Sequence, residues 1–141
     1  MVAIAKRALV VARNALNGSE VTSGLEQLGC SVDAVGTGLD ALRLMGKQCP
    51  YDLIVTELLL DRISGLALVI IARKKNPTIR TIALNNGSKT LQLLAMESGV
   101  DQVLELPLNA KKVSEVAGLI LAETTVRNGV TNQLTGSWVW L

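Results

Sequence analysis

Hydrophobic residues along the chain follow two alternating patterns. Short apolar runs rich in β-branched residues recur between segments of about ten to fifteen residues whose apolar positions repeat every three or four residues. This alternation is typical of β-α-β units, in which a helix connects two parallel strands. The sequence therefore predicts an α/β domain built on a parallel sheet.

Five strands and five helices can be placed by this pattern. The strands are expected at residues 7–13, 30–35, 51–57, 78–85 and 101–106. The helices are expected at residues 19–28, 38–48, 64–75, 88–98 and 110–123, each ended by glycine, proline or a loss of the pattern. Right-handed crossovers would join them into a three-layer αβα sandwich of the flavodoxin-like kind, with strand order 2-1-3-4-5.

The periodicity of the helices also predicts which side chains face the sheet. In the first helix we expect Val21, Leu25 and Leu28 to face inward, and in the second Leu39, Leu42 and Met45. In the last helix we expect an inward stripe made by Val113, Val116, Leu119 and Ile120.

The pattern changes after residue 123. Residues 1–123 form the predicted domain, and residues 124–141 are an extension or linker that is polar and β-rich, with an Asn-Gly turn signal. Trp138 and Trp140 would share one face of an extended segment. Two interpretations are open: a tail that packs on its own domain or stays disordered, and a contact strip for a partner or a further domain.

Composition narrows the class of protein. The 141 residues suit one compact domain, and the formal net charge of +2, with no Phe and one Tyr, argues against binding of nucleic acid. The longest apolar runs are far shorter than the roughly 18 residues of a membrane span, and the first residues do not resemble a secretory signal. We expect a cytoplasmic protein that does not associate with membranes.

The cysteines do not indicate a metal site. Cys30 and Cys49 lie outside any CxxC spacing, and the chain has no histidine to complete a ligand set. We expect two reduced thiols, no bound metal and no cofactor.

Functional groups in a doubly wound sheet collect at the carboxyl ends of the strands. This rule selects Ala12 and Arg13 after the first strand, Glu57 after the third, Asn85 after the fourth and Leu106 after the fifth. The lone carboxylate of Glu57, at the end of the apolar segment "DLIVTE", is the most unusual of these residues.

Several segments resemble the receiver domain of two-component response regulators. The likeness extends over about residues 6–121 and rests on the order of the elements, on Glu57 followed eight residues later by Gly65, on "GLDAL" and on "ESGVDQVLELP". The intervals between these segments make the resemblance specific. It implies the fold predicted above and a role in signal transduction.

The resemblance also implies where a phosphoryl site would lie. In the family, an aspartate accepts the phosphoryl group, an acidic pair helps to hold Mg²⁺, and a hydroxyl residue and a lysine bind the phosphoryl oxygens. The matching positions here carry Glu57 as acceptor, Ala12 and Arg13 as the acidic pair, Asn85 as the hydroxyl and Leu106 as the lysine. Pro107 matches the family, and the resemblance implies a cis bond from Leu106 to Pro107.

These replacements predict that the phosphoryl chemistry is lost. Mg²⁺ requires several oxygen ligands, and one carboxylate beside a methyl group and a guanidinium does not supply them. Without metal or lysine, nothing neutralises the charge of a transferring phosphoryl group. The family's aromatic switch residue falls at Val103, and its hydroxyl partner falls at Asn85.

Three roles can be considered for Glu57, beside the alternative that Glu57 and Arg13 are solvated side chains that do not meet. Because strands one and three are neighbours in this fold, the guanidinium of Arg13 can form an ion pair with Glu57 where metal would otherwise lie. The longer carboxylate can instead act as a fixed imitation of a phosphorylated aspartate, or as a weak phosphoryl acceptor.

A dinucleotide-binding site is a further alternative. "GTGLDA" follows a predicted strand and opens a helix, with Gly36, Gly38 and Ala41 at the fingerprint positions and Glu57 at the end of the next strand. The short helix, the β-α unit that precedes this segment and the short remaining chain argue against it.

We therefore expect a degenerate receiver that is not an enzyme and that acts by protein–protein interaction, independently of phosphorylation. The partner would be another protein, a second copy of the chain or an output domain in a longer protein. The candidate interaction residues are Leu91, Leu94, Met96, Val103, Trp138 and Trp140.

Overall fold

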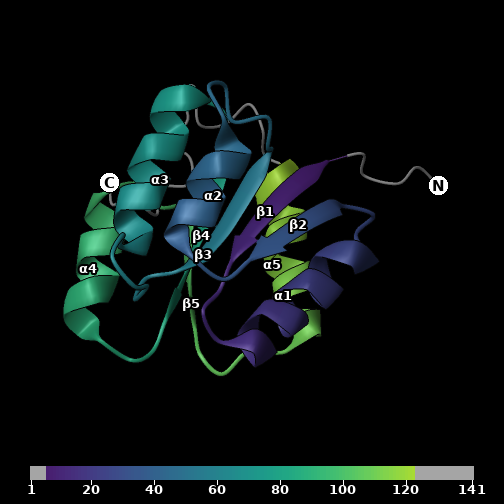
Figure 1. The fold of residues 1–141 in the computed structure, drawn as a ribbon. Helices are drawn as coiled ribbons and strands as arrows, with labels where there is room; N and C mark the ends of the chain where they lie inside the picture. Colours follow the sequence, from purple (N-terminus) through teal and green to yellow (C-terminus); the bar gives the residue numbers. More distant parts are fainter. Residues whose placement is uncertain (1–5, 123–141) are drawn as a thin grey trace.

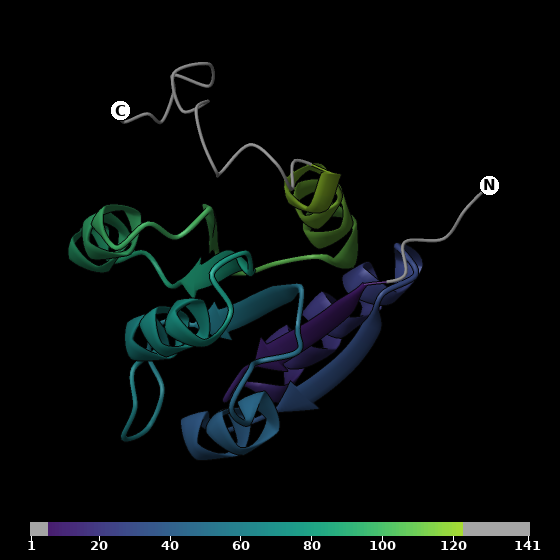
Figure 2. The same cartoon turned by 90° about the horizontal axis from the view of Figure 1, so that it is seen from above.

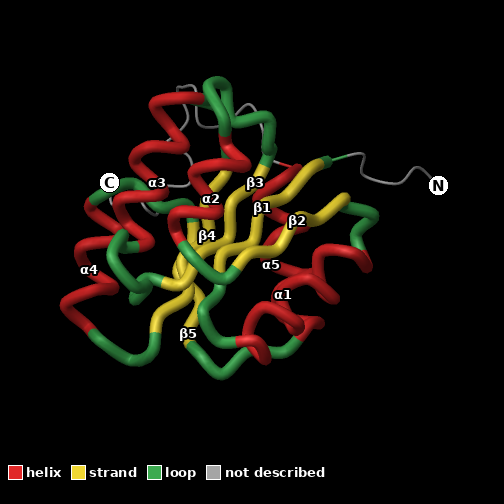
Figure 3. Tube along the Cα trace, viewed as in Figure 1, coloured by secondary structure: helices red, strands yellow, loops and turns green. Residues whose placement is uncertain are grey.

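The computed structural model describes residues 6–122 and contains one five-stranded parallel sheet (Figures 1 and 3). The strand order is β2-β1-β3-β4-β5, as predicted. The strands are β1 (Arg7–Val11), β2 (Ser31–Val35), β3 (Leu53–Glu57), β4 (Arg80–Asn85) and β5 (Gln102–Glu105). The helices are α1 (Ala15–Gln27), α2 (Gly38–Met45), α3 (Gly65–Lys75), α4 (Lys89–Glu97) and α5 (Ala110–Ala122).

Helices cover both faces of the sheet, which gives the predicted three layers (Figure 2). On one face, α1 and α5 pack together over β1, β3 and β4 through Val21, Leu25, Val113 and Ala117. On the other face, α2 and α3 cover β1 and β3, and α3 and α4 enclose a smaller cluster against β4. Every residue of β3 and β4 is buried, as expected for central strands covered on both sides.

Capping residues explain where the observed helices differ from the predicted ones. The first helix begins at Ala15, four residues before the predicted start, because the side chain of Asn14 accepts a hydrogen bond from the backbone N–H of Asn17 at 3.0 Å. The second helix ends at Met45, three residues before the predicted end, because Gly46 has a positive φ of +58°, which does not continue the helix.

Two predicted core residues are wrong. Leu39, in the first turn of α2, and Leu119, in α5, are exposed. The buried stripe of α5 is made by Val113, Ala117, Ile120 and Leu121. Leu119 lies two residues from Ala117, on the opposite side of the helix, and has 67% of its surface exposed.

The predicted thiols lie within the described residues, whereas the predicted C-terminal extension does not. Cys30 and Cys49 are buried and free, as expected for thiols. The boundary at residue 123 and the predicted contacts of Trp138 and Trp140 lie outside the described residues. Within the described part of the chain, every helix is too short or too polar to cross a bilayer.

Candidate functional site

The carboxyl edge of the sheet brings the predicted site residues together. In the register of the sheet Val11 lies beside Thr56, and Glu57 lies beside Leu84, so the ends of β1, β3 and β4 meet. A pocket of about 440 Å³ opens there. It is lined by Arg13, Asn14, Asn17, Glu57, Leu58, Leu59, Leu84, Asn86 and Leu106.

Glu57 is tied to the start of α1 by both of its carboxylate oxygens. Its Oε1 accepts a hydrogen bond from the backbone N–H of Arg13 at 2.7 Å, and its Oε2 accepts from Nδ2 of Asn17 at 2.9 Å. Only 6% of the residue is exposed. The carboxylate therefore bridges β3 to the loop and first turn that follow β1.

The predicted ion pair between Arg13 and Glu57 takes a different form. Arg13 contacts Glu57 through its backbone, while its guanidinium Nη1 lies 3.3 Å from Oδ1 of Asp61, in the loop after β3. Both side chains of that pair are largely exposed. The geometry explains the difference: the backbone of Arg13 turns its N–H toward β3, and its side chain extends outward to Asp61.

Asn17 and Asp61 are site residues that the sequence interpretation missed. Asn17 was missed because the predicted helix began at residue 19, which left Asn17 outside the first turn. Recognition of Asn14 as the N-cap would have placed Asn17 on the first turn of α1, beside the end of β3. Asp61 lies in an irregular loop, and nothing in the periodicity predicted its position.

Asn85 belongs to a separate hydrogen-bonded group under the loop after β4. Its Nδ2 donates to the carbonyl of Ser88 and to Oε2 of Glu105, both at 2.9 Å. Oε1 of Glu105 accepts from the backbone N–H of Gly87 at 3.0 Å. Asn85 is buried, and these bonds direct its amide nitrogen into the loop between β4 and α4.

The remaining predicted site residues are apolar or carry backbone roles. Ala12 is buried, and its N–H donates to the carbonyl of Val35 at 3.0 Å. Leu106 lines the pocket, and the peptide bond from Leu106 to Pro107 is cis, as the resemblance implied. The lysine position of the family is therefore an apolar wall of the pocket.

The residues present do not fit a divalent cation. Each oxygen of Glu57 accepts one N–H group, and the positions that would have to supply further metal ligands carry the methyl group of Ala12 and the side chain of Arg13. Mg²⁺ prefers octahedral coordination by oxygen ligands, with at least one or two carboxylates and several waters. Among residues 6–122, no group of three or more His, Cys, Asp and Glu side chains is placed to hold a metal ion.

One glycine of the dinucleotide fingerprint has a packing role. A Cβ on Gly38 would lie 3.0 Å from the Cβ of Ile63, and Gly38 itself is buried. The first turn of α2 therefore packs closely against the loop between β3 and α3. This contact explains the glycine at position 38 without a bound pyrophosphate group, which is the role that the dinucleotide alternative gives it.

The predicted interaction residues divide into exposed and packed side chains. Leu94 and Met96 each have 46% of their surface exposed, and Leu93, which the sequence interpretation did not select, has 61% exposed. Leu91 and Val103 are partly buried and pack against the cluster between α3 and β4. We refer to Leu93, Leu94 and Met96 as the α4 apolar surface.

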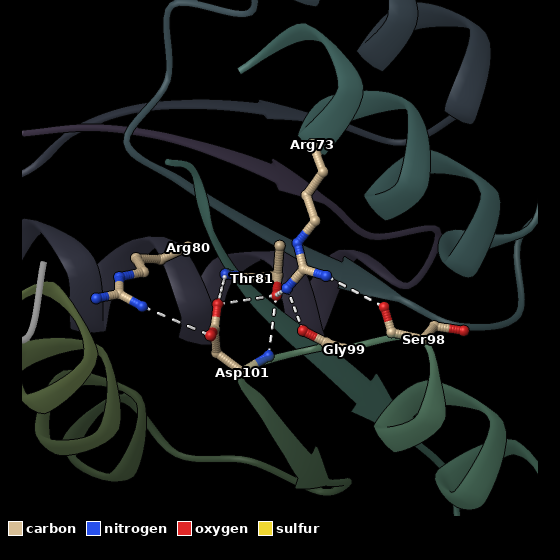
Figure 4. Close-up of polar contacts among 6 residues, drawn as sticks. All are labelled: Arg73, Arg80, Thr81, Ser98, Gly99 and Asp101. Carbon is tan, nitrogen blue, oxygen red and sulfur yellow. Dashed lines mark hydrogen bonds and ion pairs between the residues drawn. The ribbon is translucent and has the colours of Figure 1, made fainter. Parts of the chain in front are cut away.

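A second polar cluster lies at the opposite edge of the sheet (Figure 4). The guanidinium of Arg73, on α3, donates to the carbonyl of Ser98 at 3.1 Å and to the carbonyl of Gly99, at the end of α4. Asp101 accepts from the N–H and Oγ1 of Thr81, at 2.8 and 3.1 Å. These contacts join α3 to the turn between α4 and β5.

Arg73 and Tyr51, which lie outside the pocket, have pKa values that are shifted by burial. Burial lowers the pKa of the Arg73 guanidinium, and Asp101 opposes that shift. Burial, together with a hydrogen bond from the Tyr51 hydroxyl to Oδ2 of Asp33 at 2.6 Å, raises the pKa of Tyr51 to about 12.

Comparisons with protein families and sequences agree with the resemblance. The model of the response regulator receiver domain family matches residues 8–117. A probable transcriptional regulatory protein of Picosynechococcus sp. is 28% identical over 136 residues, which are 91% of this chain and 54% of the relative. The regulatory protein LuxO of Vibrio cholerae is 28% identical over 113 residues, which are 79% of this chain and 25% of that protein.

Solved structures share the fold. A receiver domain of Methanospirillum hungatei superposes with a TM-score of 0.78 and 21% identity, over 89% of this chain and 100% of that domain. NtrX of Brucella abortus, in complex with ADP, gives a TM-score of 0.79 and 22% identity, over 88% of this chain and 29% of that protein. The chain thus spans about half the length, or less, of the curated relatives it matches.

Proposed function

Because the chain belongs to the response regulator receiver domain family, we propose that it is a phosphorylation-independent receiver that transmits signals by binding another protein. It has no catalytic activity of its own in this proposal. The partner is a protein surface, provided by a separate protein, by a second copy of the chain or by an output domain in a longer protein.

The environment of Glu57 is the observation that carries the proposal. The residue is 6% exposed, and each of its carboxylate oxygens accepts a hydrogen bond from the β1–α1 segment. A phosphoryl acceptor must lie beside a metal ion, because metal supplies most of the charge neutralisation in phosphoryl transfer. Glu57 instead has a structural role, as the bridge between β3 and α1.

The other positions of the pocket support the same conclusion. Leu106 offers no charge, and the amide nitrogen of Asn85 is directed toward Ser88 and Glu105. A phosphoryl group at Glu57 would therefore carry two negative charges beside an apolar wall, without a lysine or metal as counter-ion. The same absence of partners weighs against Glu57 as an imitation of the phosphorylated state.

The α4 apolar surface is the proposed contact region. Three exposed apolar side chains on one short helix, Leu93, Leu94 and Met96, give α4 an apolar exterior of the kind that soluble proteins use for association. Since α4 has only Ala95 fully buried, it offers most of its circumference to a partner.

A phosphorylation assay tests the first half of the proposal. The protein is incubated with Mg²⁺ and acetyl phosphate, and separately with Mg²⁺ and beryllofluoride. We expect an unchanged intact mass and unchanged backbone amide NMR shifts for Arg13, Leu58 and Asn86 around the pocket. A gain of one phosphoryl group that is lost in Glu57→Gln would establish a weak phosphoryl acceptor and refute the proposal.

Association experiments test the second half. If the partner is a second copy of the chain, we expect the molar mass measured by light scattering after size exclusion to rise with protein concentration. If the partner is a fused output domain, we expect that domain to dock on α4. Leu93→Ser combined with Met96→Ser should abolish that association. Leu16→Ser is the control: Leu16, on α1, is even more exposed, at 77%, and its substitution should leave association unchanged. Equal effects of both variants would exclude the α4 apolar surface.

A further inference from the structure

Glu57 is a buried carboxylate that forms no ion pair with a cationic side chain of residues 6–122. Its hydrogen-bond donors are a backbone N–H and a side-chain amide, both neutral. The ion pairs formed by residues 6–122 do not include it, and the guanidinium of Arg13 pairs with Asp61. A buried charge without a counter-ion is costly, so a cation that enters the pocket gains more there than at an exposed carboxylate.

The N-terminus of α1 offsets only part of this cost. Glu57 lies against the first turn of α1, where the helix dipole provides about half a positive charge. Glu57, Asp61 and Arg13 together leave one uncompensated negative charge at the pocket. The local field therefore favours a ligand with a single positive charge over an anion.

The bonding geometry of Glu57 selects the shape of that cation. A carboxylate has about four acceptor sites, two on each oxygen. One site on each oxygen is filled, by Arg13 and by Asn17, and one on each remains. Two free sites on adjacent oxygens match the paired N–H groups of a planar guanidinium, which binds carboxylates through two parallel bonds.

The walls of the pocket can contact both the methylene groups and the guanidinium N–H groups of an arginine side chain. Leu59, Leu84 and Leu106 line it and can pack against methylene groups, while Asn14 and Asn86 line it with amides. Its volume of about 440 Å³ lies within the range of ligand-binding pockets, about 300 to 1,000 Å³. An arginine of a partner protein would fill part of this space.

We propose that the pocket binds a guanidinium group, supplied by an arginine side chain of the partner protein, with Glu57 as its counter-ion. The inference rests on the proposed function in one respect: the pocket must be free of Mg²⁺ and phosphate. The pocket would then be a second contact with the partner protein, at the carboxyl edge of the sheet and separate from the α4 apolar surface.

Titration with N-acetyl-arginine amide, followed by NMR, tests the proposal on the full chain. The reporters are the backbone amide of Arg13 and the side-chain amide of Asn17, because both bond to Glu57. N-acetyl-citrulline amide is the matched probe, since it has the same shape without the charge. We expect saturable shifts at both reporters with the arginine probe, and affinity about tenfold weaker with the citrulline probe.

Two variants complete the test. Glu57→Gln keeps the size of the side chain and, with the Asn17 amide reversed, its hydrogen bonds, and should weaken arginine binding about tenfold. Glu97→Gln removes the same charge from exposed α4 and should leave binding unchanged. Equal binding of the two probes, unchanged binding in Glu57→Gln, or shifts confined to other parts of the protein would refute the proposal. These outcomes leave the acetyl phosphate result unaffected, so a failure of this proposal can be distinguished from a failure of the proposed function.

Discussion

The backbone N–H of Arg13 donates to Oε1 of Glu57 across 2.7 Å, and this bond joins the carboxyl ends of the neighbouring strands β1 and β3. The acid at the end of β3 is therefore held by the segment that would have to provide a metal site. Its second oxygen is held by Asn17, on the next helix. Ala12 and Arg13 provide no carboxylate for a metal ion, and the backbone of Arg13 instead binds the carboxylate of Glu57.

Loss of the Glu57 carboxylate should destabilise the domain. Glu57→Ala leaves the N–H of Arg13 and Nδ2 of Asn17 without acceptors in a buried site, and we expect the free energy of unfolding to fall by about 1 to 3 kcal/mol. Glu57→Gln keeps an acceptor for Arg13 and should cost less. Urea denaturation measures both, and equal stability of Glu57→Ala and the wild type would show that the carboxylate has no bridging role.

Arg73 should stabilise the turn between α4 and β5. Arg73→Ala removes the donors to the carbonyls of Ser98 and Gly99, and we expect a loss of about 2 to 3 kcal/mol in unfolding free energy. Hydrogen exchange should accelerate first at the end of α4. The control is Arg43→Ala, whose exposed pair with Asp40 should contribute less than about 0.5 kcal/mol. Similar losses in both variants would contradict the assigned role of Arg73.

Two features favour glycine at position 99: the positive φ of its backbone and the nearby guanidinium of Arg73. The φ of Gly99 is +87°, and a Cβ would lie 2.5 Å from Nη1 of Arg73. Gly87 has φ of +96° with open space around it, so Gly87→Ala measures the conformational cost alone, about 1 kcal/mol. We expect Gly99→Ala to cost at least about 1 kcal/mol more, and this excess to disappear in the Arg73→Ala background. An excess that persists without Arg73 would contradict the contact.

The titration of Tyr51 should report its bond to Asp33. Tyr51 is the single tyrosine of the chain, so phenolate absorbance follows this residue alone. We expect a midpoint of about 12, above the ordinary value of 10.0, and a lower midpoint in Asp33→Asn. Because the folded state favours the protonated phenol, the stabilisation is complete below the unfolded pKa and is lost as pH rises through the folded pKa. A midpoint unchanged by Asp33→Asn would exclude the bond as a cause.

The sequence predicted the sheet well because its determinants are local. β3 and β4 have central apolar runs and are buried on both faces. Gly65 is explained by close approach, because a Cβ there would collide with the backbone carbonyl of Glu57. The alternation of elements follows from local signals. The strand order, and with it the meeting of Arg13 with Glu57 at neighbouring strand ends, was expected from the doubly wound fold class.

Side-chain directions at the site could not be predicted in the same way. The guanidinium of Arg13 can extend to Glu57 or to Asp61, and only the path of the loop after β3 decides between them. Arg73 and Asp101 lie 28 residues apart in sequence, and no periodic pattern links an arginine of α3 to a turn after α4. Leu119 was predicted inward because it follows Val113 and Val116 at three-residue intervals, but such intervals turn progressively away from the stripe that contains Ala117.

Crystals soaked in Mg²⁺ give the most direct test of the central claim, which is that the pocket lacks the donors to hold a divalent cation. The account predicts density for the Glu57 carboxylate bonded to the N–H of Arg13 and to Asn17, as in the metal-free protein, with no ion beside it. An octahedral ion coordinated by an oxygen of Glu57 would contradict the account.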